Sequence, residues 1–199
     1  MKFLSGMTVL VVSAFLMGCA TTSATYDRPT HKDDSSNYVL TLNKDFETVW
    51  KELVSYSASN FFKIDNYEKD SGLITLSFGA SNPSEFVTGG KWHYNQNVPL
   101  NPGNNYSFDG EYVDFLMENG GTFTGRMNLV VQGNSGNNTT IKINARYVVM
   151  SDSRDTWVFN TGNCSVINVQ NPSRGTGRTR EICPTYKAEK AIINAMKFK

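Results

Sequence analysis

The chain has 199 residues, of which 39% are hydrophobic and 19% charged. That balance excludes an intrinsically disordered chain and fits one domain with a core of ordinary size. The 16 Gly residues, together with many Asn and Ser, predict turns and therefore a β-rich fold. Apart from Lys2 in the leader, 18 basic side chains balance 18 acidic ones, so no excess charge attracts nucleic acid.

The first 18 residues have the pattern of a secretory leader. Lys2 precedes an apolar run from Met7 to Met17. The run is shorter than the roughly 20 residues that a membrane-spanning helix needs. It ends in Leu16-Met17-Gly18-Cys19, with an apolar residue three positions before the cysteine and a small one directly before it. This motif resembles the lipobox of bacterial lipoproteins.

The resemblance implies cleavage after Gly18 and attachment of acyl chains, such as palmitate, to Cys19. Several chains anchor a protein firmly, because each buried methylene contributes about 0.8 kcal/mol. Ala20, in place of Asp, resembles the outer-membrane address of enterobacterial lipoproteins. We therefore expect residues 1–18 to be a lipoprotein signal peptide and the mature protein to face the periplasm from the outer membrane. An ordinary signal peptide with an incidental cysteine is the alternative.

Residues 19–37 are polar, contain Pro29 and show no apolar period, which predicts a flexible tether. A single domain is then expected over residues 38–199. It opens with a strand at 38–42 and a helix capped by Asn43. The apolar stripe of this helix follows the helical period and consists of Phe46, Val49, Trp50, Leu53 and Val54.

Two hairpins are predicted, one at 62–78 with Gly72 in its turn and one at 123–150 with its turn at 133–138. Between them, residues 79–119 lose any clear period, and we expect a long irregular excursion with a strand or short helix near 112–117. One more strand is expected within 155–169, and a closing helix from Pro184 to Phe198.

This order predicts an α+β fold in which an antiparallel sheet packs on a long C-terminal helix and one N-terminal helix, a helix-grip-like sandwich. Residues 45–53, 64–65 and 69–74 resemble the start of domains in the C-subunit lipoprotein of the β-barrel assembly machine. These positions are ones that any strand, helix and hairpin core favours, and the Asn- and Gly-rich middle departs from that family. The resemblance therefore implies nothing specific about function.

Cys164 and Cys183 are the two cysteines beyond the leader, and in an oxidising compartment they are expected to form a disulfide. The bridge would close a loop rich in Asn, Gly, Ser and Arg that has little apolar content of its own. Neither cysteine has a C-x-x-C or zinc-ligand spacing, so redox catalysis and metal binding are the weaker alternatives.

The sequence offers little for catalysis. His31 lies in the expected tether, so an acid/base mechanism would depend on His93 alone, for which a surface or packing role is the alternative. Four acidic residues are close in sequence but lack a calcium-loop spacing, and a solvated face is favoured. They are Asp109, Glu111, Asp114 and Glu118.

Two groups are candidate contacts for a ligand or partner. Arg174, Arg178 and Arg180 lie in a Gly- and Thr-rich stretch that would suit a phosphate, a sugar acid or lipopolysaccharide, although it lacks a P-loop pattern. Trp92 and Tyr94 belong to an aromatic cluster that extends to residue 115. A mobile basic loop and packing of the aromatic rings are the respective alternatives.

These observations favour a membrane-anchored lipoprotein that is not an enzyme, needs no cofactor or metal, and binds a protein partner in an envelope assembly. A module for a small ligand, a glycan or lipopolysaccharide is the second hypothesis. An anchored hydrolase is the third.

Overall fold

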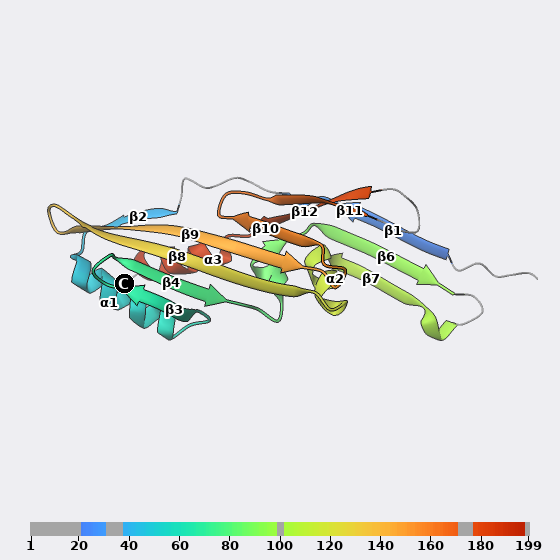
Figure 1. Cartoon of the computed structure of the whole chain (residues 1–199), viewed down its shortest axis with the longest axis horizontal. Coiled ribbons are helices and arrows are strands. Elements are labelled where there is room, and N and C mark those ends of the chain that lie inside the picture. Colours follow the sequence, from blue (N-terminus) through green and yellow to red (C-terminus); the bar gives the residue numbers. More distant parts are fainter. Residues whose placement is uncertain (1–20, 31–37, 99–101, 171–176, 198–199) are drawn as a thin grey trace, which may run out of the picture.

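The fold is described by a computed structural model for residues 21–30, 38–98, 102–170 and 177–197. It is an α+β fold in which three α-helices accompany antiparallel sheets. Figure 1 shows an elongated molecule, with the main sheet toward one end and a smaller sheet at the other.

The main sheet is built around a long hairpin. Its six strands are β2 (Val39–Leu42), β3 (Lys63–Glu68), β4 (Leu73–Phe78), β8 (Thr122–Asn134), β9 (Asn138–Met150) and β10 (Thr156–Asn160). Strands β8 and β9 pair along their whole length and bury alternate side chains, as expected for a sheet with one covered face. The predicted hairpins at 62–78 and 123–150 are confirmed, and Gly72 has φ +67° in the first turn.

Two helices cover one face of this sheet and contact each other, α1 (Phe46–Ala58) and α3 (Lys187–Lys197) (Figure 1). The N-cap of α1 is Asp45, whose carboxylate accepts a hydrogen bond of 2.9 Å from the Thr48 amide. The cap is therefore not Asn43, because the chain makes a bend before the helix begins. Val49 and Leu53 are fully buried, which confirms the predicted apolar stripe.

The closing helix begins later than predicted. Pro184 ends a strand rather than opening a helix, and Tyr186 then takes φ +63° before α3 begins at Lys187. A proline suits a strand end because it has no amide hydrogen to donate. In its described part α3 has 11 residues against 13 in α1, so the expectation that the C-terminal helix is the long one is not confirmed.

A second sheet of three strands replaces both part of the expected tether and the expected irregular excursion. It consists of β1 (Thr21–Asp27), β6 (Lys91–Asn97) and β7 (Tyr106–Glu111), in the order β1-β6-β7. The tether prediction is wrong for residues 21–27, because Ala24 and Tyr26 pack against the core. Residues 31–37 lie outside the described part. The predicted short helix near 112–117 is confirmed as α2 (Tyr112–Glu118).

The third sheet joins two strands from the C-terminal part of the chain to a short strand from its middle. Its members are β11 (Ser165–Gln170), β12 (Gly177–Pro184) and the short β5 (Val87–Thr88). The single strand expected within 155–169 is thus two strands, β10 and β11, because a turn with Gly162 at φ +90° separates them. Two short 3-10 turns complete the described elements, η2 (Pro83–Glu85) and η3 (Pro102–Asn104).

Candidate functional site

Arg180, one of the predicted contact residues, lies inside the protein among aromatic rings. Its guanidinium carbon is 4.3 Å from the centre of the Tyr26 ring, 4.6 Å from that of Trp92 and 5.5 Å from that of Tyr112. The rings come from β1, β6 and α2, and Arg180 comes from β12. Arg180 is 6% exposed and Trp92 is 8% exposed. We call these four residues the arginine cage.

Cation–π attraction balances the cost of burying this charge. Burial lowers the pKa of Arg180, while the neighbouring tyrosines act in the opposite direction. A guanidinium nevertheless stays protonated in proteins. Burial also raises the pKa of Tyr112 to about 12, so this ring remains a neutral phenol at physiological pH. A cation over neutral rings gains roughly 2 kcal/mol when it is shielded from water.

Tyr26 also fixes the first strand to the rest of the molecule. Its hydroxyl donates a hydrogen bond of 3.1 Å to the Glu181 carbonyl and accepts one of 3.0 Å from the Glu181 amide. The Trp157 indole donates to the Arg180 carbonyl at 3.3 Å. The cage is therefore a joint between β1 and β12, and its members are engaged in packing.

The remaining predicted contacts do not form an open site. Tyr94 is half-buried, stacks on Trp92 with ring centres 6.4 Å apart, and donates to Gln96 at 3.0 Å. Arg178 is exposed on β12. Arg174 and Cys19 lie outside the described residues.

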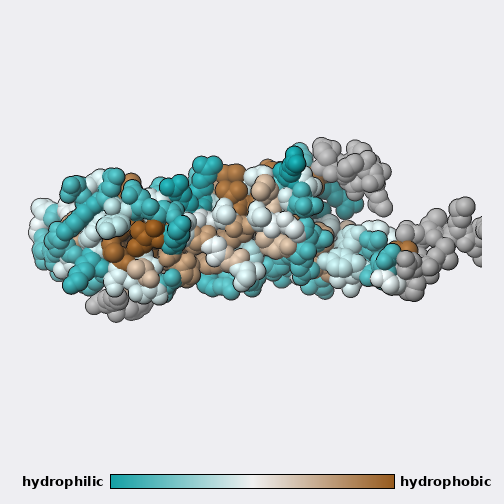
Figure 2. Space-filling view, turned by 60° about the horizontal axis from the view of Figure 1, so that its bottom comes forward, coloured by the Kyte–Doolittle hydropathy of each residue, from teal (hydrophilic) through white to brown (hydrophobic). Residues whose placement is uncertain are grey.

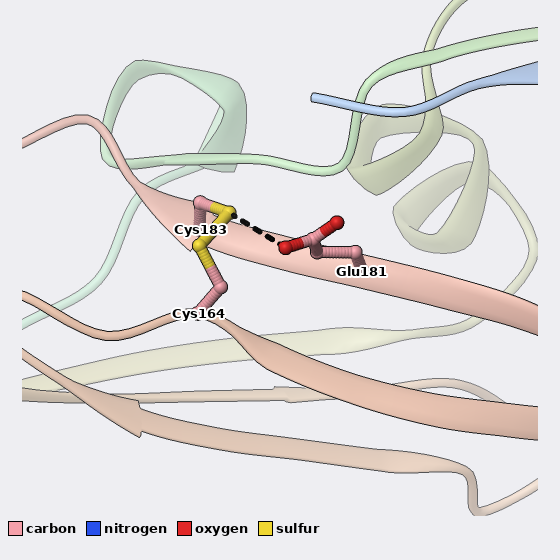
Figure 3. Close-up of side chains that lie close together, drawn as sticks. All are labelled: Cys164, Glu181 and Cys183. Carbon is pink, nitrogen blue, oxygen red and sulfur yellow. Dashed lines mark hydrogen bonds between the residues drawn. A yellow bond between two sulfur atoms is a disulfide. The ribbon is translucent and has the colours of Figure 1, made fainter. Parts of the chain in front are cut away.

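The predicted disulfide between Cys164 and Cys183 is present (Figure 3). It joins the chain just before β11 to the end of β12, and Cys183 is fully buried. The Glu181 carboxylate points toward the bridge, with its oxygen 3.9 Å from the Cys183 sulfur. Within the described ranges, these three residues are the only group of possible metal ligands that lie close together. Because the two sulfurs are bonded to each other, they offer no thiolates to a metal.

His93 lies on the outer face of the small sheet between two carboxylates. Its Nδ1 atom is 2.9 Å from an oxygen of Asp109, and its Nε2 atom is 4.0 Å from an oxygen of Asp27. The depression around it holds about 270 Å³ and includes Ser23 and Ser107. Among the hydroxyl groups of the described residues, none makes a hydrogen bond to the ring. The geometry is that of a surface histidine beside two carboxylates.

Three of the four acidic residues singled out in the sequence contact separate partners. Glu111 contacts Lys91 at 3.2 Å, and Glu118 accepts from the Tyr106 hydroxyl at 3.3 Å. Asp109 is the partner of His93. The structure therefore does not gather them into a carboxylate site.

Sequence reasoning missed a pair of arginines on the uncovered face of the main sheet. Arg126 on β8 lies directly opposite Arg146 on β9, and both side chains are exposed. Across the described part of the chain, neither arginine has an ion pair. The alternation of the predicted hairpin, with Met127 and Ala145 facing the core, already places both arginines on the opposite face.

Apolar side chains accompany the arginines on the same face. Val158 is 43% exposed and lies opposite Val148, and Met150 is 40% exposed next along β9. Lys142 lies on the same face of β9, four residues before Arg146. We call Arg126, Lys142, Arg146, Val148, Met150 and Val158 the open face.

A second feature that sequence reasoning missed is a buried acid. Glu189 on α3 is fully buried and accepts hydrogen bonds from the Tyr147 hydroxyl at 2.6 Å and the Thr161 hydroxyl at 2.9 Å. Burial raises the pKa of Glu189. Because no part of this carboxyl reaches solvent, it belongs to the core and not to a surface site.

Comparison with known proteins found no matching family model, no matching curated protein and no matching solved structure. A search of the described helices found none with the length and apolar character needed to cross a membrane.

Proposed function

We propose that the chain is the precursor of a membrane-anchored lipoprotein, whose domain binds a protein partner in an envelope assembly and carries out no catalysis. The observation that carries this proposal is Leu16-Met17-Gly18-Cys19 at the end of an apolar run. The acylated Cys19 would hold the domain on the periplasmic side of the outer membrane. We further propose that the architecture is of helix-grip type, in which the main sheet packs around α1 and α3.

The disulfide supports an extracytoplasmic location. Bridges such as Cys164–Cys183 form and persist in oxidising compartments such as the bacterial periplasm, and they are rare in the cytosol. A protein that is exported by a leader and stapled by a disulfide fits that environment.

The open face supports binding of a protein partner. Like charges directly opposite each other on paired strands destabilise a sheet, by the order of 0.2 to 1 kcal/mol. Arg126 and Arg146 are such a pair, and an acidic partner would convert their repulsion into attraction. Arg is enriched in protein interfaces, and the exposed Val158 and Met150 add apolar area that a partner would bury.

Subcellular fractionation tests the anchor. The wild-type protein is expected in the membrane fraction, and Cys19→Ser is expected to lose this association, because no acyl chain can be attached to the sulfur. Cys164→Ser is the matched control and should stay with the membrane. Wild-type protein recovered from the soluble fraction would contradict the proposal.

Photo-cross-linking in intact cells tests the partner. A photoreactive residue at Val158 is expected to give a discrete cross-linked complex, and the charge reversals Arg126→Glu and Arg146→Glu should remove it. A photoreactive residue at the exposed Lys190 on α3 serves as the control for the covered side of the sheet. Equal cross-linking from both positions would contradict binding on the open face.

A binding module for an anionic ligand such as lipopolysaccharide is the second candidate, because the same arginine pair suits phosphate groups. Purified lipopolysaccharide should then bind the isolated protein and lose affinity in the Arg126→Gln, Arg146→Gln double variant. Retained affinity in that variant would dismiss this candidate.

A further inference from the structure

We propose that one end of the small sheet, formed by the start of β1, the end of β6 and the start of β7, rests on the lipid headgroups. We call it the held end, and the long axis of the molecule then points away from the membrane. The inference deepens the proposed function and rests on the anchor at Cys19. Three observations carry it: the position where β1 begins, the topology of the small sheet, and the distribution of charge.

The folded part begins almost at the anchor. Strand β1 starts at Thr21, two residues after Cys19. Consecutive Cα atoms are 3.8 Å apart, so the Cα atoms of these two residues lie within about 8 Å of each other. A free chain of the whole predicted tether would have allowed a separation of roughly 20 to 25 Å.

Strand β1 is also firmly fixed to the domain. It pairs with β6 at every position from Thr21 to Asp27, and the arginine cage and the Glu181 backbone hold Tyr26. The start of β1 therefore cannot leave the sheet without breaking these contacts. The anchor at Cys19 consequently fixes the position of the small sheet relative to the membrane, and not only the position of the chain end.

The topology identifies which end is held. Thr21 pairs with Asn97, and Gln96 pairs with Tyr106, so the start of β1, the end of β6 and the start of β7 lie together. Figure 1 shows this end at one extreme of the long axis, while the turn between β8 and β9 lies at the other. A strand of 13 residues such as β8 alone spans roughly 43 Å, so the far end is well away from the bilayer.

The strands at the held end carry no formal charge of their own. Residues 21–26, 94–98 and 102–107 contain no Asp, Glu, Lys or Arg, although such residues make up 19% of the chain. The charges of the sheet begin toward its other end, at Asp27, Lys91 and Asp109, while Glu118 of α2 reaches the Tyr106 hydroxyl at 3.3 Å. Contact of these strands with headgroups then removes none of their side chains as a charge from water, which would be costly.

Aromatic character at the held end fits the same surface. Tyr106 is 37% exposed beside the end of β6. Tyrosine is enriched at membrane interfaces, because its ring is apolar and its hydroxyl remains hydrated. The colours of Figure 2 show that hydrophilic residues cover much of the molecule on the face displayed, with apolar patches in the half that holds α1.

Fluorescence quenching in vesicles tests this orientation. The mature, acylated protein would carry one added cysteine with an environment-sensitive fluorophore, at Asn97 in the held end or at Ser135 in the β8–β9 turn. Both positions are exposed. With nitroxide-labelled headgroups in phosphatidylethanolamine and phosphatidylglycerol vesicles, most of the emission from position 97 should be lost and that from position 135 should be unchanged.

A long Gly/Ser insertion after Ala20 is the matched control. It should leave flotation with the vesicles intact and abolish the quenching at position 97, because it restores a free tether. Loss of flotation by the parent protein overturns the anchor and this inference with it. Flotation with equal quenching at positions 97 and 135 overturns the orientation alone.

Discussion

Among single residues, the most unusual side chain is that of Arg180, whose guanidinium is buried among aromatic rings. Three rings surround it, and it donates a hydrogen bond of 3.1 Å to the Thr179 carbonyl. The aliphatic part of the Arg180 side chain and its planar guanidinium fill space that a smaller side chain would leave empty. The cage should therefore contribute measurably to stability.

Replacing Arg180 with Ala should lower the free energy of unfolding by roughly 2 to 4 kcal/mol, because the cation–π attraction and the packing are both lost. Arg180→Lys should recover only part of this loss, since an ammonium cannot stack as a plane. Urea denaturation measures the effect. Arg178→Ala is the matched control at an exposed position, and an equal loss in both alanine variants would contradict the cage.

Glu189 gives a prediction about pH. Its folded-state pKa is raised above the ordinary value of 4.5, so the unfolded chain releases this proton first as the pH rises. The stability that Glu189 contributes is therefore complete below about pH 4.5 and decreases as the pH rises toward the folded pKa. Glu189→Gln cannot ionise, and its stability should decrease less over that range.

Urea denaturation at several pH values measures this difference. The free energy of unfolding of the wild type should fall relative to that of Glu189→Gln as the pH is raised from about 4.5 to 8. Glu68→Gln, at an exposed position on β3, should follow the wild type. Parallel curves for wild type and Glu189→Gln would show that this carboxyl does not titrate abnormally.

At the scale of elements, the disulfide closes the segment that contains β11 and β12. The two cysteines are 19 positions apart, and a loop of this size corresponds to roughly 3 kcal/mol in the chain-entropy model. The Cys164→Ala, Cys183→Ala double variant should lose about this much in chemical denaturation. Reduced wild-type protein should behave like the variant, and unchanged stability in both would contradict a structural role.

The long hairpin of β8 and β9 could be predicted because the residues that specify it are neighbours in the sequence. Apolar residues alternate on both sides of a Gly- and Asn-rich turn, and Met127 and Ala145 both lie on the buried face. The same alternation places Arg126 and Arg146 on the opposite face. This pair matches no catalytic or ligand motif, so only its position across two strands distinguishes it.

The small sheet could not be predicted in the same way. Strand β1 pairs with β6, in which Asn97 lies 76 positions after its partner Thr21, and no local sequence period indicates such a pairing. Its outward positions are Thr and Ser, which also suit a tether. Trp92 and Arg180 were predicted separately, as possible ligand or partner contacts, and their contact with each other and with Tyr26 of this strand was not predicted.

In the whole molecule, three parts follow one another along one axis. The charge-free end of the small sheet lies next to the proposed anchor, the arginine cage joins that sheet to β12, and the main sheet extends away from the anchor (Figure 1). In this arrangement the open face stands clear of the bilayer and is accessible to a protein partner. Every part of this arrangement depends on acylation of one cysteine.

Mass spectrometry of the N-terminal peptide, taken from protein extracted from bacterial membranes, tests that claim most directly. If Cys19 is acylated as proposed, the peptide begins at Cys19 and carries a diacylglycerol on the sulfur and an acyl chain on the new amine. A peptide that retains residues 1–18 and has an unmodified Cys19 would contradict it.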